Sequence, residues 1–251
     1  MKLSAIGASS TRLLTGRIRN LHKTRRTQDF FFTTSDRAKM GATAIATGLA
    51  GLGGIATGLS GMAMDTTEEA DLLEFDLDGK AVRAWVWQSV FDEGDEVEVV
   101  AEQSDGLWQG YGIFRVCDRI VALHPHCSKG RYAHYKSTFR LIVMSFCALY
   151  AVMWAIGVLM MLVRHDGDYR SFIEFMLVGG VAAFGVYGVI GYRVSRKFMG
   201  FVRLAEGIFS GFGWSNVRSI DLPAITKKNK GPGDPGALGV LYFRYSDEQA
   251  G

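Results

Sequence analysis

Cysteine and proline are scarce in this chain of 251 residues, which has three cysteines and four prolines. An odd number of widely spaced cysteines, at positions 117, 127 and 147, cannot build a disulfide framework and matches no zinc-finger spacing. The few prolines, and 31 glycines without a three-residue period, exclude a proline-rich disordered chain and collagen. The sequence also lacks a phosphate-binding glycine loop, a dinucleotide-binding fingerprint and a catalytic serine-histidine-acid set. We therefore expect that the protein is not an enzyme.

Charge is missing from two long stretches, residues 141–163 and 175–192, which have 23 and 18 consecutive uncharged residues. A helix rises ~1.5 Å per residue, so each stretch is long enough to cross the ~30 Å hydrocarbon core of a bilayer. The short polar connection at 164–170 then predicts an antiparallel transmembrane hairpin. Two buried core helices are the alternative, but a protein of 27.6 kDa could hardly bury both on all sides.

A third uncharged stretch, residues 41–64, is less apolar and carries seven glycines among its 24 residues. Two interpretations stay open: a membrane segment that is re-entrant, peripheral or a third span, or a flexible Gly/Ala-rich helical hairpin lying against the other helices. Small residues at four-residue spacing let helices approach closely in a bilayer. They predict these helix-packing faces: Ala46, Ala50, Gly54 and Gly58 in this stretch, Ala151 and Ala155 in the first span, and Gly179 and Ala183 in the second.

The distribution of basic residues predicts the orientation in the membrane. The first 40 residues carry nine Lys+Arg against two Asp+Glu, and the tail from residue 193 carries nine against five, whereas the 164–170 connection carries two Lys+Arg. If only the hairpin spans, the positive-inside rule places both termini and the middle of the chain in the cytoplasm, which is the orientation we expect. If residues 41–64 also span, the C-terminal tail lies on the opposite side from the N-terminus, against the charge. The N-terminal residues do not have the pattern of a cleavable secretory signal.

Short runs of β type occur between residues 71 and 123. Apolar and polar residues alternate on both sides of Asp78-Gly79, a pair that is typical of a two-residue hairpin turn. Further runs at 97–101, 107–116 and 120–123 bring the number of predicted strands to five. They fit a small closed β-barrel of OB-like or SH3-like type, to which the basic segment 13–19 is a candidate further contributor.

OB-like barrels often bind nucleic acid through a basic groove with stacking aromatic rings. Residues 65–139, however, carry 15 Asp+Glu against seven Lys+Arg, a balance that would repel phosphate. We therefore expect no nucleic acid to bind, and we expect the tryptophans to lie in the core. The aromatic residues concerned are Trp85, Trp87, Trp108 and Tyr111.

Four residues that could ligate a metal ion cluster in the sequence: His124, His126, Cys127 and His134. Imidazole and thiolate suit zinc or copper, and four such ligands would complete a tetrahedron. Their spacing matches no zinc pattern, and the neighbours His126 and Cys127 would point to opposite faces of a strand. These residues remain weak candidates, and we expect neither a metal nor a cofactor.

Apolar residues at helical spacing between 198 and 212 predict an amphipathic helix that either lies in the membrane interface or packs on the barrel. A strand-like run at 238–245 follows. The expected fold is therefore an α+β membrane protein. Its predicted parts are a basic segment at 1–40, the Gly/Ala-rich segment at 41–64, an acidic β-barrel domain at 65–136, the transmembrane hairpin at 140–193, and an amphipathic helix and C-terminal strand at 194–251.

Several runs in the same order along nearly the whole chain resemble a family of bacterial membrane proteins labelled type VI secretion system effectors. The runs are residues 15–21, 27–33, 124–131, 201–206 and 233–238, together with the Gly/Ala-rich segment. The resemblance implies a protein that a contractile injection machine delivers into a neighbouring cell, where it acts at the membrane. It brings no catalytic residues.

Two functions are therefore expected. The first is a multi-pass protein of the bacterial inner membrane that acts as an effector and permeabilises its target membrane through the 41–64 segment. The alternative is a resident scaffold, assembly or immunity protein whose cytoplasmic barrel binds a protein partner. The expected partners are the lipid bilayer, a second copy of the chain, and a secretion chaperone or immunity protein.

Overall fold

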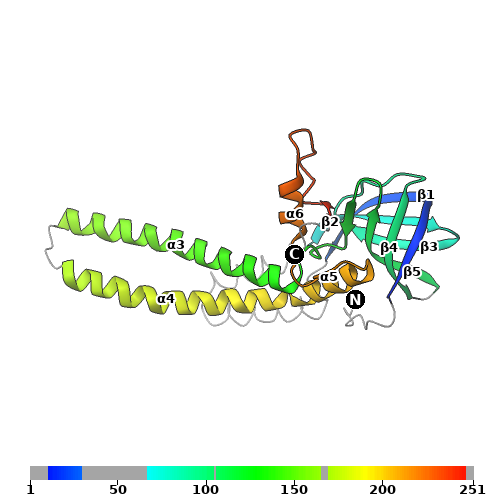
Figure 1. The fold of residues 1–251 in the computed structure, drawn as a ribbon. Helices are drawn as coiled ribbons and strands as arrows, with labels where there is room; N and C mark the ends of the chain where they lie inside the picture. Colours follow the sequence, from blue (N-terminus) through cyan, green and yellow to red (C-terminus); the bar gives the residue numbers. More distant parts are fainter. Residues whose placement is uncertain (1–10, 30–66, 105, 165–168, 247–251) are drawn as a thin grey trace, which may run out of the picture.

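The computed structural model describes residues 11–29, 67–104, 106–164 and 169–246 (Figure 1). A β-barrel forms one end of the molecule, and two long antiparallel helices extend away from it side by side. The helices are α3 (Arg131–Arg164) and α4 (Tyr169–Lys197). The α+β class with a small barrel is confirmed. The segment 41–64, with Ala46, Ala50, Gly54 and Gly58, lies outside the described residues.

The barrel has five strands in an OB-like arrangement. They are β1 (Thr11–Asp29), β2 (Thr67–Leu77), β3 (Lys80–Val86), β4 (Glu96–Ser104) and β5 (Leu107–Arg115). Antiparallel pairings join β3 to β2, β2 to β1, β1 to β4 and β4 to β5. A parallel pairing between β3 and β5 closes the barrel, so no strand edge is left open within it.

The strand β1 completes the barrel in place of the predicted run at 120–123. Its residues up to Arg17 pair with β4, and those from Ile18 onward pair with β2. A register shift between Arg19 and His22, with Asn20 at φ 53°, marks the bend that lets one strand serve both neighbours. The strand β6 (Ile120–Leu123) instead extends the sheet outside the barrel, where it pairs with β7 (Phe243–Arg244).

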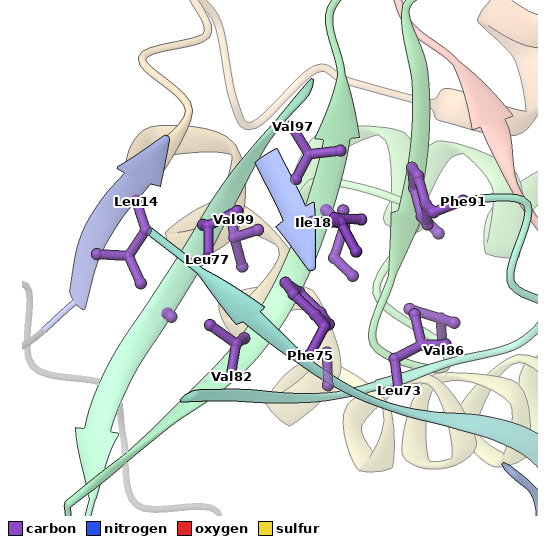
Figure 2. Packing of buried hydrophobic residues seen from close by; sticks show 14 of the residues in the cluster. Leu14, Ile18, Leu73, Phe75, Leu77, Val82, Val86, Phe91, Val97 and Val99 are labelled. Carbon is purple, nitrogen blue, oxygen red and sulfur yellow. The ribbon is translucent and has the colours of Figure 1, made fainter. Parts of the chain in front are cut away.

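The predicted hairpin between residues 73 and 86 is confirmed. Asp78 and Gly79 both have positive φ, 49° and 80°, as a two-residue turn of the I′ type requires. Alternate side chains of β2 and β3 point into the barrel, where Figure 2 shows them with side chains of β1 and β4. Phe91, from the loop between β3 and β4, is fully buried in the same core. Trp108 also belongs to this core, as expected, whereas Trp85 and Trp87 are half-buried.

The predicted amphipathic helix is α5 (Met199–Gly211), and it packs on the barrel. Its apolar face forms a second core with residues of β4 and β6. A Cβ at Gly112 of β5 would lie 2.7 Å from Ile208, and a Cβ at Gly211 would lie 2.7 Å from Val100. These two glycines therefore let α5 approach the sheet closely. The short helix α6 (Leu222–Asn229) follows, and the predicted strand at 238–245 is reduced to the two residues of β7.

The strand β1 also changes the charge of the barrel from that expected for residues 65–136. It brings six basic residues: Arg12, Arg17, Arg19, Lys23, Arg25 and Arg26. Lys23 pairs with Asp92 at 3.0 Å, and Arg25 pairs with Glu69 at 3.1 Å. The barrel is therefore less acidic than its continuous stretch of sequence predicts, because the basic segment and the acidic segment fold into one sheet.

Candidate functional site

The candidate site lies where the barrel meets the long helices. Residues 124–131, here called the connector, run from the end of β6 to the start of α3. The amide of Gly130 donates to the carbonyl of Ile220 at 2.8 Å, and the amide of Leu222 donates to the carbonyl of Ser128 at 3.1 Å. Lys129 also forms an ion pair with Asp221, at 3.2 Å between Nζ and Oδ2. Residues 128–130 of the connector are thus fixed by residues 220–222 at the start of α6.

Gly130 is the point of closest approach within the connector. A Cβ at this position would lie 2.1 Å from the carbonyl oxygen of Val217 and 2.7 Å from that of Arg218. Real Cβ atoms do not approach backbone atoms so closely, and backbone atoms cannot rotate away as a flexible side chain can. Only glycine fits here without displacing one of the two segments.

The start of α3 is held by residues from two other parts of the chain. Glu206 of α5 accepts a hydrogen bond from the Arg131 amide at 2.8 Å and forms an ion pair with the Arg131 guanidinium at 3.1 Å. The carbonyl of Arg218 accepts from the Tyr132 amide at 2.8 Å. The first amides of a helix have no partner within the helix and carry partial positive charge, so a carboxylate here is stabilising.

His126 connects three elements at the same junction. Its Nε2 lies 2.7 Å from the Glu68 carboxylate near the start of β2. Its ring centroid lies 5.0 Å from that of Trp87 and 5.2 Å from that of Phe201 in α5. Its backbone has φ 66°, a conformation that is uncommon for a residue other than glycine. These contacts place the end of the β1–β2 pair beside the base of the long helices.

The remaining candidate ligands have other partners. His134 Nε2 lies 2.9 Å from the hydroxyl of Ser195, a contact that joins the bases of α3 and α4. His124 is 6% exposed, and its burial lowers its pKa to about 4. Cys127 is buried in the second core, and burial raises the pKa of its thiol. Across the described ranges, no three His, Cys, Asp or Glu side chains are arranged to hold a metal ion.

The two long helices contact each other mainly through aromatic side chains. The Tyr150 hydroxyl donates to the carbonyl of Met176 at 2.6 Å. The ring of Phe146 meets that of Phe184 edge to face, with centroids 5.0 Å apart. Closer to the barrel than these two contacts, the hydroxyl of Ser145 lies 2.9 Å from that of Tyr187. Polar atoms within this interface are thus paired with each other, as an apolar environment requires.

Glycines in these helices lie beneath large side chains of the opposite helix. A Cβ at Gly180 would lie 2.4 Å from the Tyr150 hydroxyl, one at Gly157 would lie 2.5 Å from Phe172, and one at Gly191 would lie 2.4 Å from Ile142. These three glycines are not among the helix-packing residues predicted from the sequence. The pattern of glycines within apolar runs is visible in the sequence, but the large residue that faces each of them is not.

The predicted helix-packing residues occupy other positions. Ala151, Ala155 and Ala183 are exposed, and a Cβ at Gly179 would meet no atom within 4 Å. Gly179 and Ala183 do line a groove of about 340 Å³ between the helices, together with aromatic residues such as Tyr150. In this single chain, the close approaches at Gly157, Gly180 and Gly191 each place a glycine opposite a large side chain.

Neither a protein-family model, nor a curated protein, nor a solved structure matches the chain. The function is therefore inferred from the geometry of the described residues.

Proposed function

We propose that this is an integral membrane protein in which α3 and α4 cross the bilayer and hold the OB-like barrel at one membrane surface, as a scaffold for a protein partner. The observation that carries the proposal is the exposure of both helices. Each has an 18-residue window that is long and apolar enough to span a membrane, with mean hydropathy of 2.3 and 1.9, and no residue of either window is buried. A lipid environment accounts for this composition on all sides of the hairpin.

The size of the exposed apolar surface supports the same conclusion. Side chains such as Val163, Val178 and Val181 are 73%, 73% and 76% exposed, and similar exposure recurs along both helices. Contiguous apolar patches on soluble monomers rarely exceed a few hundred Å². Two helices with this surface would associate or aggregate in water, whereas in a bilayer the same side chains face acyl chains.

The junction supports a scaffold role. The connector, Glu206 and His126 each join the barrel to the base of the helices through hydrogen bonds or ion pairs. A barrel held in this way has a defined orientation relative to the bilayer, whereas a flexible linker would leave it free to rotate. A fixed binding module suits assembly of a partner at the membrane surface.

The proposal places β1 and β2 on the same side of the membrane, because Asp29 at the end of β1 pairs directly with Thr67 at the start of β2.

The three native cysteines provide the experiment that tests membrane insertion. Cys117 is exposed near the end of β5, Cys147 is exposed within the apolar part of α3, and Cys127 is buried. Single-cysteine variants would be prepared by replacing the other two cysteines with serine. In isolated membranes opened to both faces, a charged maleimide should label the Cys117 variant and leave the Cys147 variant unlabelled.

Denaturation in SDS provides the matched control, because it should make Cys147 as reactive as Cys117. Labelling of Cys147 in native membranes at the rate of Cys117 would contradict insertion of α3. Removal of the protein from membranes by alkaline carbonate would contradict it independently.

An effector that permeabilises membranes is the second candidate function. It rests on the stripe Ala46, Ala50, Gly54 and Gly58, which lies outside the described residues, and on the family resemblance. Membrane potential would be measured in cells expressing the native protein or the Gly54→Leu, Gly58→Leu variant at equal membrane abundance. Depolarisation by the native protein alone would favour the effector. Unchanged potential with both proteins would favour the scaffold.

A further inference from the structure

We propose that a basic collar at the base of the two helices binds the headgroups of anionic phospholipids in the leaflet next to the barrel. This inference rests on the proposed membrane insertion and adds a lipid specificity to it. The collar consists of Lys136 and Arg140 of α3, Arg193, Arg196 and Lys197 of α4, and Arg203 of α5. All six side chains are exposed.

The helix contacts place the collar residues of α3 and α4 in one band across both helices. Ile142 of α3 lies against Gly191 of α4, and His134 bonds Ser195. Arg140 and Arg193 therefore lie at about the same height, each at the end of an uncharged run. At ~1.5 Å per residue, the α3 members span ~6 Å along the helix axis, which is within the headgroup region of a leaflet.

The acidic side chains near this band already contact a basic side chain or a histidine. Glu206 pairs with Arg131 at 3.1 Å, Asp221 pairs with Lys129 at 3.2 Å, and Glu68 contacts His126 at 2.7 Å. Within the part of the chain that the structure describes, none of the six collar side chains forms an ion pair. The collar is thus a concentration of positive charge that the acidic side chains of the described residues do not neutralise.

The opposite end of the hairpin differs. There Arg170 pairs with Glu174 of the same helix at 2.9 Å. Among the described side chains, the barrel end therefore presents a band of basic groups without ion pairs, whereas the opposite end presents the Arg170–Glu174 pair. Juxtamembrane basic clusters of this kind bind anionic lipid surfaces in preference to zwitterionic ones.

A groove beside the collar offers room for the upper part of a lipid. It has a volume of about 380 Å³ and lies between the bases of α3 and α4. His134 and Thr138 line it at the level of the collar, and Leu141 and Ile190 line it farther along the helices. At its far end the hydroxyls of Ser145 and Tyr187 contact each other at 2.9 Å, so the apolar side chains between the two polar ends offer the surface for an acyl chain. Exposed aromatic rings of Tyr135, Phe139 and Tyr192 at the same level suit the membrane interface.

Competition between two lipids in the full-length protein tests the proposal. The purified chain would be reconstituted into nanodiscs from an equimolar mixture of phosphatidylglycerol and phosphatidylcholine. The lipids that remain bound after extraction into mild detergent would then be quantified by mass spectrometry. We expect the native protein to retain severalfold more phosphatidylglycerol than phosphatidylcholine, and the excess to fall at high salt.

Two variants with the same loss of charge separate the collar from net charge. The collar variant carries glutamine at Lys136, Arg140, Arg193, Arg196, Lys197 and Arg203. The control variant carries glutamine at six exposed positions elsewhere: Arg12, Arg17, Arg19, Lys80, Lys227 and Lys228. The collar variant should retain the two lipids about equally, whereas the control variant should keep the native preference.

The outcomes distinguish this inference from the proposed function. If all three proteins insert into nanodiscs and retain phosphatidylglycerol and phosphatidylcholine in the same ratio, the proposed lipid binding by the collar is overturned, whereas membrane insertion is supported. The same loss of preference in the control variant would also overturn it, because net charge alone would then explain binding. Failure of the native protein to insert into nanodiscs would contradict the membrane function and the collar together.

Discussion

Glu206 of α5 accepts a hydrogen bond from the backbone amide of Arg131, the first residue of α3, at 2.8 Å. Its second carboxylate oxygen lies 3.1 Å from the Arg131 guanidinium. Because α5 packs on the barrel, this one carboxylate both stabilises the N-terminus of a long helix and links that helix to the barrel. The junction therefore depends on a side chain that lies 75 residues away in sequence from the helix it caps.

Replacement of Glu206 by alanine should destabilise the protein by about 1–3 kcal/mol, because the substitution removes hydrogen bonds to a charged group that is largely buried. For a chain of this size, that corresponds to a decrease of about 2–4 °C in Tm per kcal/mol. Thermal unfolding in mild detergent, followed by tryptophan fluorescence, would measure the change. Asp92→Asn is the matched control, since Asp92 is 82% exposed and pairs only at the surface. An equal loss in both variants would contradict the proposed role of Glu206.

Gly130→Ala should destabilise the junction by about 1–3 kcal/mol, because the new methyl group would collide with the Val217 carbonyl. Gly200→Ala in α5 is the control, since a Cβ at that position meets no atom within 4 Å. Alanine also has the higher helix propensity, so the control should be neutral or slightly stabilising. Limited proteolysis between the barrel and α3 would follow the junction directly. Proteolysis of both variants at the native rate would show that the connector tolerates a wider spacing.

Neighbouring glycines in α4 should respond differently to the same substitution. Gly180→Leu would place a side chain against the ring of Tyr150, whose hydroxyl is held by the Met176 carbonyl. We expect it to separate the helices and to lower stability by about 1–3 kcal/mol. Gly179→Leu has room at its Cβ and should cost less than 1 kcal/mol. The SDS concentration that abolishes the near-ultraviolet circular dichroism would compare the two. A larger loss in Gly179→Leu would instead support the small-residue packing predicted from the sequence.

Features that depend on neighbouring residues could be predicted from the sequence. The uncharged runs predicted the two long helices, and Asp78-Gly79 with its alternating flanks predicted the β2–β3 hairpin. Features that depend on distant partners could not be predicted in the same way. The role of β1 as the fifth barrel strand follows from its pairings with both β2 and β4. Likewise, the need for glycine at position 130 follows from the approach of Val217, which no local pattern shows.

The histidines illustrate the same difference at the candidate site. The proximity of His124, His126, Cys127 and His134 in sequence made them candidates for a metal site. In the structure, His126 contacts Glu68 and His134 contacts Ser195, so their ring nitrogens face different parts of the molecule. The contacts of His126 and His134 come from β2 and α4, which are distant in sequence, so no local pattern shows that these residues are contacts of the junction.

Burial of His124 should make stability depend on pH. Its pKa is lowered from 6.5 to about 4, chiefly because burial disfavours the charged imidazolium. Between these two values the unfolded chain binds a proton that the folded protein does not, so the free energy of unfolding rises with pH there. The lowered pKa of His124 therefore contributes about 3 kcal/mol to the free energy of unfolding above about pH 6.5. This contribution is lost progressively as the pH falls towards 4.

The matched variant is His124→Gln, which removes the titrating group from this buried position. Tm would be measured between pH 7 and 4, a range in which stability should fall steeply for the native protein and less steeply for the variant. The carboxyl groups of Asp118 and Asp234 have pKa values below their usual 3.8, so they lose their native interactions mainly below this range. Parallel pH profiles for the two proteins would show that His124 is not the group responsible.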